Sequence, residues 1–155
     1  MSKHSTSEQH LLLIEKVLLL KSLDIFEATP ETVLTEVAEI LEEVQIEKGT
    51  KIFKVGDIAN CMYIIHKGEI NIDKDGHTLA VLRENDIFGE LSLLDTETRS
   101  ANASANTDVF LLRMDQEPFY ELMENRIEVA RGIIKTLCRR IRAQNVKSVE
   151  NSLKK

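Results

Sequence analysis

The sequence predicts a mainly β domain with flanking helices (α+β), in which antiparallel strands form a barrel or jelly roll. Short β-type segments fill the middle of the chain, whereas helical periodicity is confined to its two ends. The β-type segments are separated by turn signals at Lys48-Gly49, Gly56-Asp57, Lys67-Gly68, Asp75-Gly76 and Glu84-Asn85-Asp86. No helical pattern lies between these segments, which favours an antiparallel arrangement over a parallel sheet.

Two helices are expected before the strands. The apolar runs Leu11–Ile14 and Val17–Leu20 indicate a helix with a broad buried face, well short of the ~20 residues that span a bilayer. That face can pack on its own domain, on a second copy of the chain or on another part of a larger protein, and own-domain packing is the default expectation. In the second helix Thr29 is the predicted N-cap and Pro30 the first helical residue. Its apolar stripe comprises Val33, Leu34, Val37, Ile40, Leu41 and Val44.

The β region from Val44 onward contains one sharp hairpin signal and one clear alternation. Asp75-Gly76 is typical of a two-residue hairpin turn. After Arg99, three alanines alternate with polar residues, so the small side chains should share one face of a strand and the polar ones the other. These residues are Ala101, Ala103 and Ala105 against Ser100, Asn102 and Ser104.

Two further helices are expected after the strands. Asp115 is the predicted cap of a short helix with Pro118 in its first turn, and a longer helix follows. The apolar stripe of the longer helix comprises Ile127, Ala130, Ile134, Leu137, Cys138 and Ile141. Residues 126–155 contain nine basic residues (Lys and Arg) but only two acidic ones (Asp and Glu). A solvated outer face that complements the helix dipole explains these cations better than nucleic-acid binding does.

Length and composition indicate one domain and disfavour several functions. The chain has 155 residues, a net charge of −6, no Trp and 5% aromatic residues, which argues against nucleic-acid binding by stacking. Cys61 and Cys138 are interpreted as reduced thiols because no second pair completes a metal site. The four histidines, His4, His10, His66 and His77, have no ligand-like spacing. The first ten residues lack the features of a signal peptide, so a cytoplasmic location is expected.

The segment from Asp86 to Ala105 carries the candidate site. Gly89 permits close approach of a ligand to the main chain, and residues 90–94 can form one helical turn whose free amides face an anion. Arg99 offers a planar fork of donors to a phosphate, whereas Glu90 can only accept hydrogen bonds and therefore needs a hydroxyl partner. Ser100 can donate one more bond to the phosphate. The pattern predicts a site for a sugar phosphate; the alternative is a surface turn in which Glu90 and Arg99 pair with each other.

The residues Phe88-Gly89-Glu90-Leu91-Ser92-Leu93-Leu94, followed by Arg99-Ser100-Ala101, resemble the phosphate-binding cassette of the cyclic-nucleotide-binding domain family. That family includes the catabolite activator protein, the regulatory subunits of protein kinase A and the cyclic-nucleotide-gated channels. The resemblance covers roughly Ile14 to Asn145, with glycines 49, 56, 68 and 89 where the family turns its chain. Thr98 and Asn102 depart from the common pattern, but neither removes a ligand-binding group.

The resemblance implies a ligand, a set of contacts and a domain plan. The ligand is cyclic AMP or cyclic GMP, and Ser100, where many cyclic-GMP binders have threonine, favours cyclic AMP. The implied contacts are Gly89, Glu90, Leu91, Arg99 and Ser100 with the ribose phosphate, and Ile72, Leu79, Gln144 and Asn145 with the base or sugar. The binding domain spans residues 14–145, after a flexible segment 1–13 with the start of the lead-in helix, and before a basic, disordered tail 146–155. The C-terminal helices form a lid that shifts on binding.

The resemblance further implies a regulatory domain that is not an enzyme and requires neither cofactor nor metal. A homodimer or an attached effector is the expected partner, and the helix-turn-helix that reads DNA in activator-type relatives is missing from this chain. Two alternative functions belong to other classes of protein. A cupin-type enzyme would need closely spaced histidines, which are absent. A ligand-free relative that serves in dimerisation or protein docking stays open, although Glu90 and Arg99 argue against it.

Overall fold

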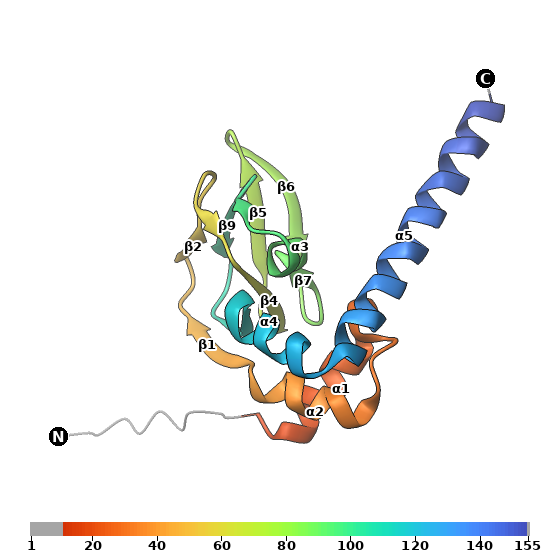
Figure 1. Ribbon diagram of the computed structural model, residues 1–155. Helices are drawn as coiled ribbons and strands as arrows, with labels where there is room; N and C mark the ends of the chain where they lie inside the picture. The colour runs from red at the N-terminus through yellow and green to blue at the C-terminus, as the bar shows by residue number, and fades with distance from the viewer. Residues whose placement is uncertain (1–10, 155) are drawn as a thin grey trace.

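The computed structural model describes residues 11–154 and contains two four-stranded β-sheets with most of the helices at one end (Figure 1). The N-terminal helices are α1 (Leu13–Ser22), the 3-10 helix η1 (Asp24–Phe26) and α2 (Glu31–Glu39). The strands are β1 (Glu42–Ile46), β2 (Lys51–Phe53), β3 (Ile58–Ala59), β4 (Cys61–Lys67), β5 (Ile70–Lys74), β6 (His77–Leu82), β7 (Ile87–Phe88), β8 (Glu97–Thr98), β9 (Asn102–Ala105) and β10 (Val109–Asp115). Helix α3 (Glu90–Leu94) lies between β7 and β8, and α4 (Gln116–Asn125) and α5 (Ile127–Leu153) follow β10.

The predicted fold class is confirmed. Two four-stranded sheets, β1-β10-β4-β7 and β2-β9-β5-β6, make up the jelly roll, with a small β3-β8 pair beside them. Neighbouring strands run antiparallel throughout, as in the register Leu112 opposite Ile64. The predicted hairpin is present, since Asp75 and Gly76 have φ of 53° and 78° and join β5 to β6. Two positive φ values are what a twist-matched two-residue turn requires.

The hydrophobic core has two parts, and β4 belongs to both. Its odd-numbered residues Cys61, Tyr63 and Ile65 lie in a cluster with Ala103 and Ala105 from the other sheet. Its even-numbered residues Met62 and Ile64 lie in a second cluster with the helices. Because successive strand residues point to opposite faces, a strand covered on both sides reads as a continuous apolar run. The predicted alanine face is confirmed for Ala103 and Ala105, which are buried while Asn102 and Ser104 are half-buried; Ala101 precedes β9 and is itself half-buried.

The N-terminal helices differ from the prediction in two details. Helix α2 ends at Glu39, and Val44 belongs to strand β1, so the predicted helical stripe is too long. The N-cap position is Pro30, whose carbonyl accepts from the Val33 and Leu34 amides at 2.9 and 3.1 Å. Thr29 does not cap the helix, because its Oγ1 is buried without a hydrogen-bond partner beside helix α5.

Helix α1 packs on its own domain, but over a narrower face than predicted. Val17 and Leu20 are buried, whereas Leu12, Ile14 and Leu18 are exposed.

Helix α4, the first of the two C-terminal helices, has Asp115 at its N-cap position as predicted. The Asp115 carboxylate makes no capping bond, however, and instead accepts from Arg113 Nε at 2.7 Å.

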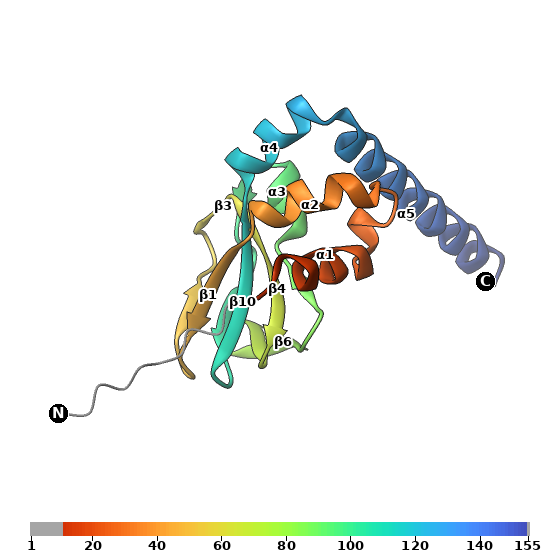
Figure 2. The same ribbon diagram turned by 90° about the horizontal axis from the view of Figure 1, so that it is seen from below.

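Helix α5 buries a different face from the one that the sequence indicated. Its buried residues are Val129, Gly132, Ile133 and Thr136. The predicted stripe is largely exposed, with Ile127, Ile134 and Ile141 retaining 56%, 59% and 57% of their accessible surface. The helix also continues to Leu153, where the sequence predicted a disordered tail from residue 146. Figure 2 shows α5 beside the α1–α2 region and then extending beyond the rest of the domain. Among residues 11–154, no helix is both long and apolar enough to cross a membrane.

Candidate functional site

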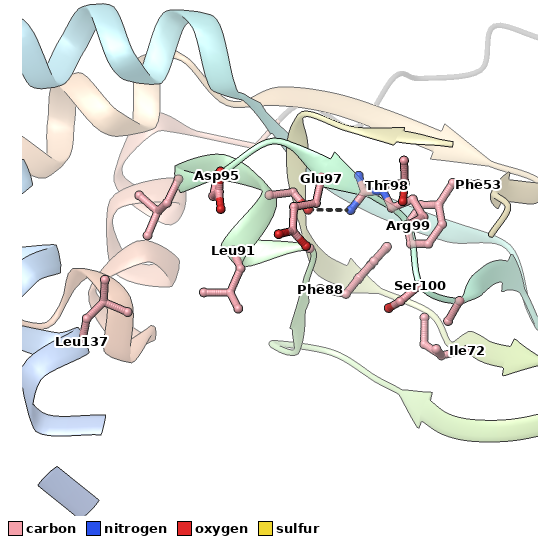
Figure 3. Close-up of a pocket in the computed structure, with 14 residues that line it drawn as sticks. Phe53, Ile72, Phe88, Leu91, Asp95, Glu97, Thr98, Arg99, Ser100 and Leu137 are labelled. Carbon is pink, nitrogen blue, oxygen red and sulfur yellow. Dashed lines mark hydrogen bonds between the residues drawn. The ribbon is translucent and has the colours of Figure 1, made fainter. Parts of the chain in front are cut away.

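A cavity of about 560 Å³ opens between the sheets, helix α3 and helix α5. It is lined by Phe53, Ile72, Phe88, Gly89, Leu91, Ser92, Leu94, Asp95, Glu97, Thr98, Arg99, Ser100, Ala101 and Leu137. Figure 3 shows Arg99 and Ser100 near Ile72 at one end of this cavity, and Leu91 toward Leu137 at the other. The Arg99 end of the cavity therefore combines a cation and a hydroxyl with the apolar side chains of Phe53 and Ile72.

Arg99 is held rigidly within the domain, with only 7% of its surface exposed. Its backbone is tied to the Gly56-Asp57 turn, because its N–H donates to Asp57 O at 2.7 Å and its carbonyl accepts from Gly56 N at 2.9 Å. Its Nη2 donates to Cys61 O at 3.0 Å and approaches Cys61 Sγ at 3.4 Å, and its Nη1 donates to Ser92 Oγ at 3.3 Å. Its Cζ lies 4.2 Å from the ring centroid of Phe53, a cation–π distance.

The guanidinium of Arg99 still has an unused donor. Among residues 11–154 its hydrogen-bond partners are neutral groups, and its Nε is buried without any partner. A buried cation without a charged partner is costly, so an anion in the cavity beside it would be stabilised. The cavity can therefore accommodate an anion at Arg99.

Gly89 brings the main chain against this guanidinium. It is the N-cap residue of α3 with φ of 76°, and a Cβ at this position would lie 2.5 Å from Arg99 Nη1. Only a glycine leaves room for Arg99 here. The chain thus starts α3 at the edge of the cavity.

Glu90 has a different environment from the one expected. It does not line the cavity, and it is not paired with Arg99 as in the surface-turn alternative. Both of its carboxylate oxygens accept from Arg140 of helix α5, Oε1 from Nη1 at 3.0 Å and Oε2 from Nη2 at 3.3 Å. The same guanidinium also holds Asp24 of η1, with Nη2 2.7 Å from Oδ1. The hydrogen bonds that Arg140 donates to Asp24 and, second in size, to Glu90 raise the pKa of Arg140 above its ordinary value.

The structure brings together some of the predicted site residues but not others. Gly89, Leu91, Arg99, Ser100 and Ile72 line one cavity. Leu79 does not, because it is exposed on strand β6, which forms the edge of its sheet. Gln144 and Asn145 lie exposed on the distal part of α5.

Several residues that line the cavity or contact the site were not predicted from the sequence. Phe53 and Leu137 line the cavity but have the pattern of ordinary apolar strand and helix positions, and Phe88 belonged to the predicted motif without an assigned contact. Asp95 and Glu97 place two carboxylates in the same lining, so an anionic ligand must be held by Arg99 against their repulsion. The only signal for Glu97 was its position two residues before Arg99. Arg140 gave no signal, because it is one of several arginines on a basic helix.

Residues 43–126 match the cyclic nucleotide-binding domain family, and the chain belongs to that family. It is similar to a cAMP-dependent protein kinase regulatory subunit of Schizosaccharomyces pombe, with 33% identity over 77% of this chain and 28% of the relative. It is also similar to a CRP-like cAMP-activated global transcriptional regulator of Mycobacterium tuberculosis, with 28% identity over 78% of this chain and 56% of the relative. The chain therefore spans between about a quarter and just over half of the length of these relatives.

Solved structures give the same assignment. The N-terminal domain of a transcriptional regulator from Streptomyces coelicolor A3(2) is similar with a TM-score of 0.77 and 29% identity, covering 82% of this chain and 94% of that one. The regulatory domain of Toxoplasma gondii PKA, solved with cAMP, has a TM-score of 0.66 and 28% identity, covering 71% of this chain and 44% of that one. The resemblance found in the sequence is thus confirmed at the level of family and fold.

Proposed function

We propose that this domain is a cyclic-nucleotide sensor that binds cyclic AMP in preference to cyclic GMP and shifts its C-terminal helices on binding. The observation that carries the proposal is Arg99, whose guanidinium lies in the wall of a cavity and has only neutral hydrogen-bond partners among residues 11–154. A cyclic phosphate would supply the missing opposite charge, and Ser100 at the same end would donate a further bond. The relatives whose names include cAMP support the same ligand class.

The remaining contacts follow from the form of the ligand. Gly89 borders Arg99 at the phosphate end, Leu91 lies farther along the cavity toward Leu137, Glu90 accepts from the ribose hydroxyl, and Ile72 contributes to the apolar wall. Leu79, Gln144 and Asn145 would contact the base or sugar only after the parts that carry them move. Because α5 already lines the cavity through Leu137, a ligand that fills the cavity alters the position at which α5 is most stable.

Calorimetric titration with cyclic AMP and cyclic GMP tests the ligand. We expect the Arg99→Ala variant to lose about 2 to 5 kcal/mol of binding free energy, because a phosphate deprived of its charged partner is released faster. The Arg99→Lys variant keeps the charge but loses the planar fork of donors, so its affinity should lie between those of wild type and Arg99→Ala. Arg83→Ala is the matched control, since Arg83 is exposed on the surface and pairs only with Glu69 at 3.4 Å among the described residues. Wild-type protein that binds neither nucleotide would overturn the proposal.

The ribose contact has its own test. Glu90→Gln should weaken binding of the ribonucleotide more than binding of its deoxyribose analogue, because the analogue has no hydroxyl to lose. Equal losses for the two ligands would count against the contact. Folding of each variant is checked by denaturant unfolding.

We further infer that the domain regulates an attached or associated effector from a cytoplasmic location, is not itself an enzyme and requires no cofactor. The relatives named as a regulatory subunit and a transcriptional regulator support a regulatory role. Cys61 and Cys138 are free thiols, which fits a reducing compartment.

Dimerisation or protein docking is the second candidate function. The exposed stripe of Ile127, Ile134 and Ile141 on α5 favours it, because large apolar side chains aligned on a helix are typical of an interface. Analytical ultracentrifugation with and without cyclic nucleotide separates the two. A dimer that forms independently of nucleotide, in a protein that fails to bind either nucleotide, would favour this second function.

A further inference from the structure

One guanidinium joins three elements that are far apart in the sequence. Arg140 of α5 donates through Nη1 to Glu90 Oε1 of α3 at 3.0 Å. It also donates to Asp24 of η1, through Nη2 to Oδ1 at 2.7 Å and through Nε to Oδ2 at 3.1 Å. Arg140 is therefore shared between two carboxylates, one from the N-terminal helices and one from the cassette.

The contact with Glu90 is less exposed to water than the contact with Asp24. The side chains of Arg140 and Glu90 keep 31% and 25% of their surface exposed, whereas Asp24 keeps 56%. A partly buried carboxylate that loses its cation pays a larger desolvation cost than an exposed one. Glu90 is thus the partner of Arg140 that needs a replacement if the pair separates.

We propose that Arg140 is a positioning residue that holds Glu90 out of the cavity, and that a nucleotide must exchange this ion pair for its own ribose hydroxyl. The inference rests on the proposed function of Glu90. Its support is that both oxygens of Glu90 are engaged by Arg140 and that Glu90 is absent from the cavity lining. Asp24 stays with Arg140 after the exchange, so that the guanidinium is not left without a partner.

The exchange has a consequence for helix α5. Before it, Arg140 links α5 to both η1 and α3; after it, the link to α3 is gone and the link to η1 remains. A ligand that binds better to the unlinked state favours that state, and by reciprocity any partner that separates α5 from α3 would raise affinity for the nucleotide.

The neighbouring Arg139 offers a matched control. It lies on the same helix and carries the same charge, but its ion pair is with Glu27 at 3.4 Å, not with Glu90. Removing either arginine removes one positive charge from α5, and thus the same long-range attraction for an anionic ligand. Only the loss of Arg140 frees Glu90.

The experiment compares affinities for cyclic AMP and its deoxyribose analogue by calorimetry in the full chain. Arg140→Ala should bind the ribonucleotide about fivefold more tightly than Arg139→Ala does, with little difference for the analogue. Asp24→Asn should bind the ribonucleotide more weakly than wild type, because Arg140 then has no second carboxylate when Glu90 leaves. Arg140→Lys should lie between wild type and Arg140→Ala, and it keeps the test available if Arg140→Ala folds poorly.

The outcomes separate this inference from the proposed function. If wild type binds cyclic AMP but Arg140→Ala and Arg139→Ala have the same ratio of ribonucleotide to analogue affinity, the role of Arg140 is overturned and the sensor function stands. If wild type binds no cyclic nucleotide, both are overturned. A selective gain for the ribonucleotide in Arg140→Ala, absent when Glu90→Gln is added, supports the exchange.

Discussion

At the scale of single residues, the site depends on how Arg99 is surrounded. The sequence predicted its charge and its role beside Gly89, but not the ring of Phe53 beneath it or the carbonyl of Cys61 that accepts from it. Both neighbours come from other strands, so no spacing rule within residues 86–105 could reveal them. They keep the guanidinium in one orientation, which lowers the entropy that a ligand must offset.

A Gly89→Ala substitution tests the close approach of the main chain to Arg99. The new Cβ would lie 2.5 Å from Arg99 Nη1 and 3.0 Å from Cys61 O, at a φ of 76° that alanine avoids. We expect the free energy of unfolding to fall by about 1 to 3 kcal/mol and nucleotide affinity to fall with it, since the guanidinium must move.

Gly76→Ala is the control for that experiment. Gly76 has a similar φ of 78° but open space where its Cβ would point, so it carries the backbone strain without the clash. Denaturant unfolding and calorimetry on both variants should show a shared loss of stability and a loss of affinity in Gly89→Ala alone. Equal affinities would mean that Gly89 serves only the turn.

At the scale of elements, the packing of α5 depends on one glycine. A Cβ at Gly132 would lie 3.2 Å from Ala28 C and 3.2 Å from Thr29 Oγ1, so the helix approaches the chain before α2 closely. This contact explains why the face with Gly132 is buried although the isoleucine face is more apolar. Close packing along a small residue outweighs hydrophobicity only where the opposing surface fits, and the sequence does not display that surface.

Substituting Gly132 with valine should therefore separate α5 from the Ala28–Thr29 segment. We expect a loss of about 1 to 3 kcal/mol of stability from overpacking, measured by denaturant unfolding. Ala143→Val on the exposed part of α5 adds a β-branched residue to the same helix without this contact, and should cost about 0.5 kcal/mol or less. Similar losses in both variants would contradict the packing explanation.

The junction of α2 with α5 predicts a pH dependence. Arg126 donates to Glu36 through Nε at 2.7 Å and Nη2 at 2.8 Å, and these hydrogen bonds lower the pKa of Glu36 below its ordinary 4.5. A carboxyl whose pKa is lowered in the folded state adds stability above its unfolded pKa, and that stability is lost as pH falls through the folded value. We expect Glu36→Gln to narrow the gap in unfolding free energy between pH 7 and pH values below about 4.

Unfolding of wild type and Glu36→Gln across this range gives the measurement, and Glu39→Gln on the same helix is the control. The effect should be small, because both side chains of the pair are substantially exposed. A pH profile of Glu36→Gln that superimposes on the wild-type profile would exclude a contribution from the pair.

At the scale of the whole molecule, opposite charges join the basic C-terminal segment to the acidic body. Ion pairs connect Arg126 with Glu36, Arg139 with Glu27, and Arg140 with both Asp24 and Glu90. The excess of cations in residues 126–155 is thus partly neutralised within the chain. This arrangement agrees with the interpretation of these arginines as structural groups.

Beyond these pairs, the last third of α5 makes little contact with the body. Residues 144–154 are all exposed, and in Figure 1 they extend away from the sheets. Removing residues 144–155 should change the free energy of unfolding by about 0.5 kcal/mol or less, because few buried contacts are lost.

Removing residues 136–155 is the contrasting truncation, because it also deletes buried Thr136 and cavity-lining Leu137. We expect this shorter chain to be clearly less stable in thermal unfolding. A large loss from the first truncation would show that the distal helix packs on the domain in solution. A loss of nucleotide affinity with intact stability would support a contact through Gln144 or Asn145.

Local rules explain how much of this protein was predictable. Turn residues, strand alternation and helical period act over a few positions, so the order and type of most elements, the Asp75-Gly76 hairpin and the cassette with Gly89 and Arg99 were all determined by the sequence. The length of α2 and the cap at Thr29 were wrong because tertiary contacts compete with local preference at helix ends. Thr29 faces α5, so its hydroxyl does not cap the N-terminus of α2.

Only the tertiary structure decided which surfaces and charges meet. The pairing of Arg140 with Glu90 joins residues 50 positions apart, and its pairing with Asp24 joins residues 116 apart. Helix α5 carries several arginines that could pair with either carboxylate, and the rotation of the helix about its axis determines which of them does. Helix rotation follows from the shapes that pack against it, and shape complementarity is a property of the folded chain, not of any one segment.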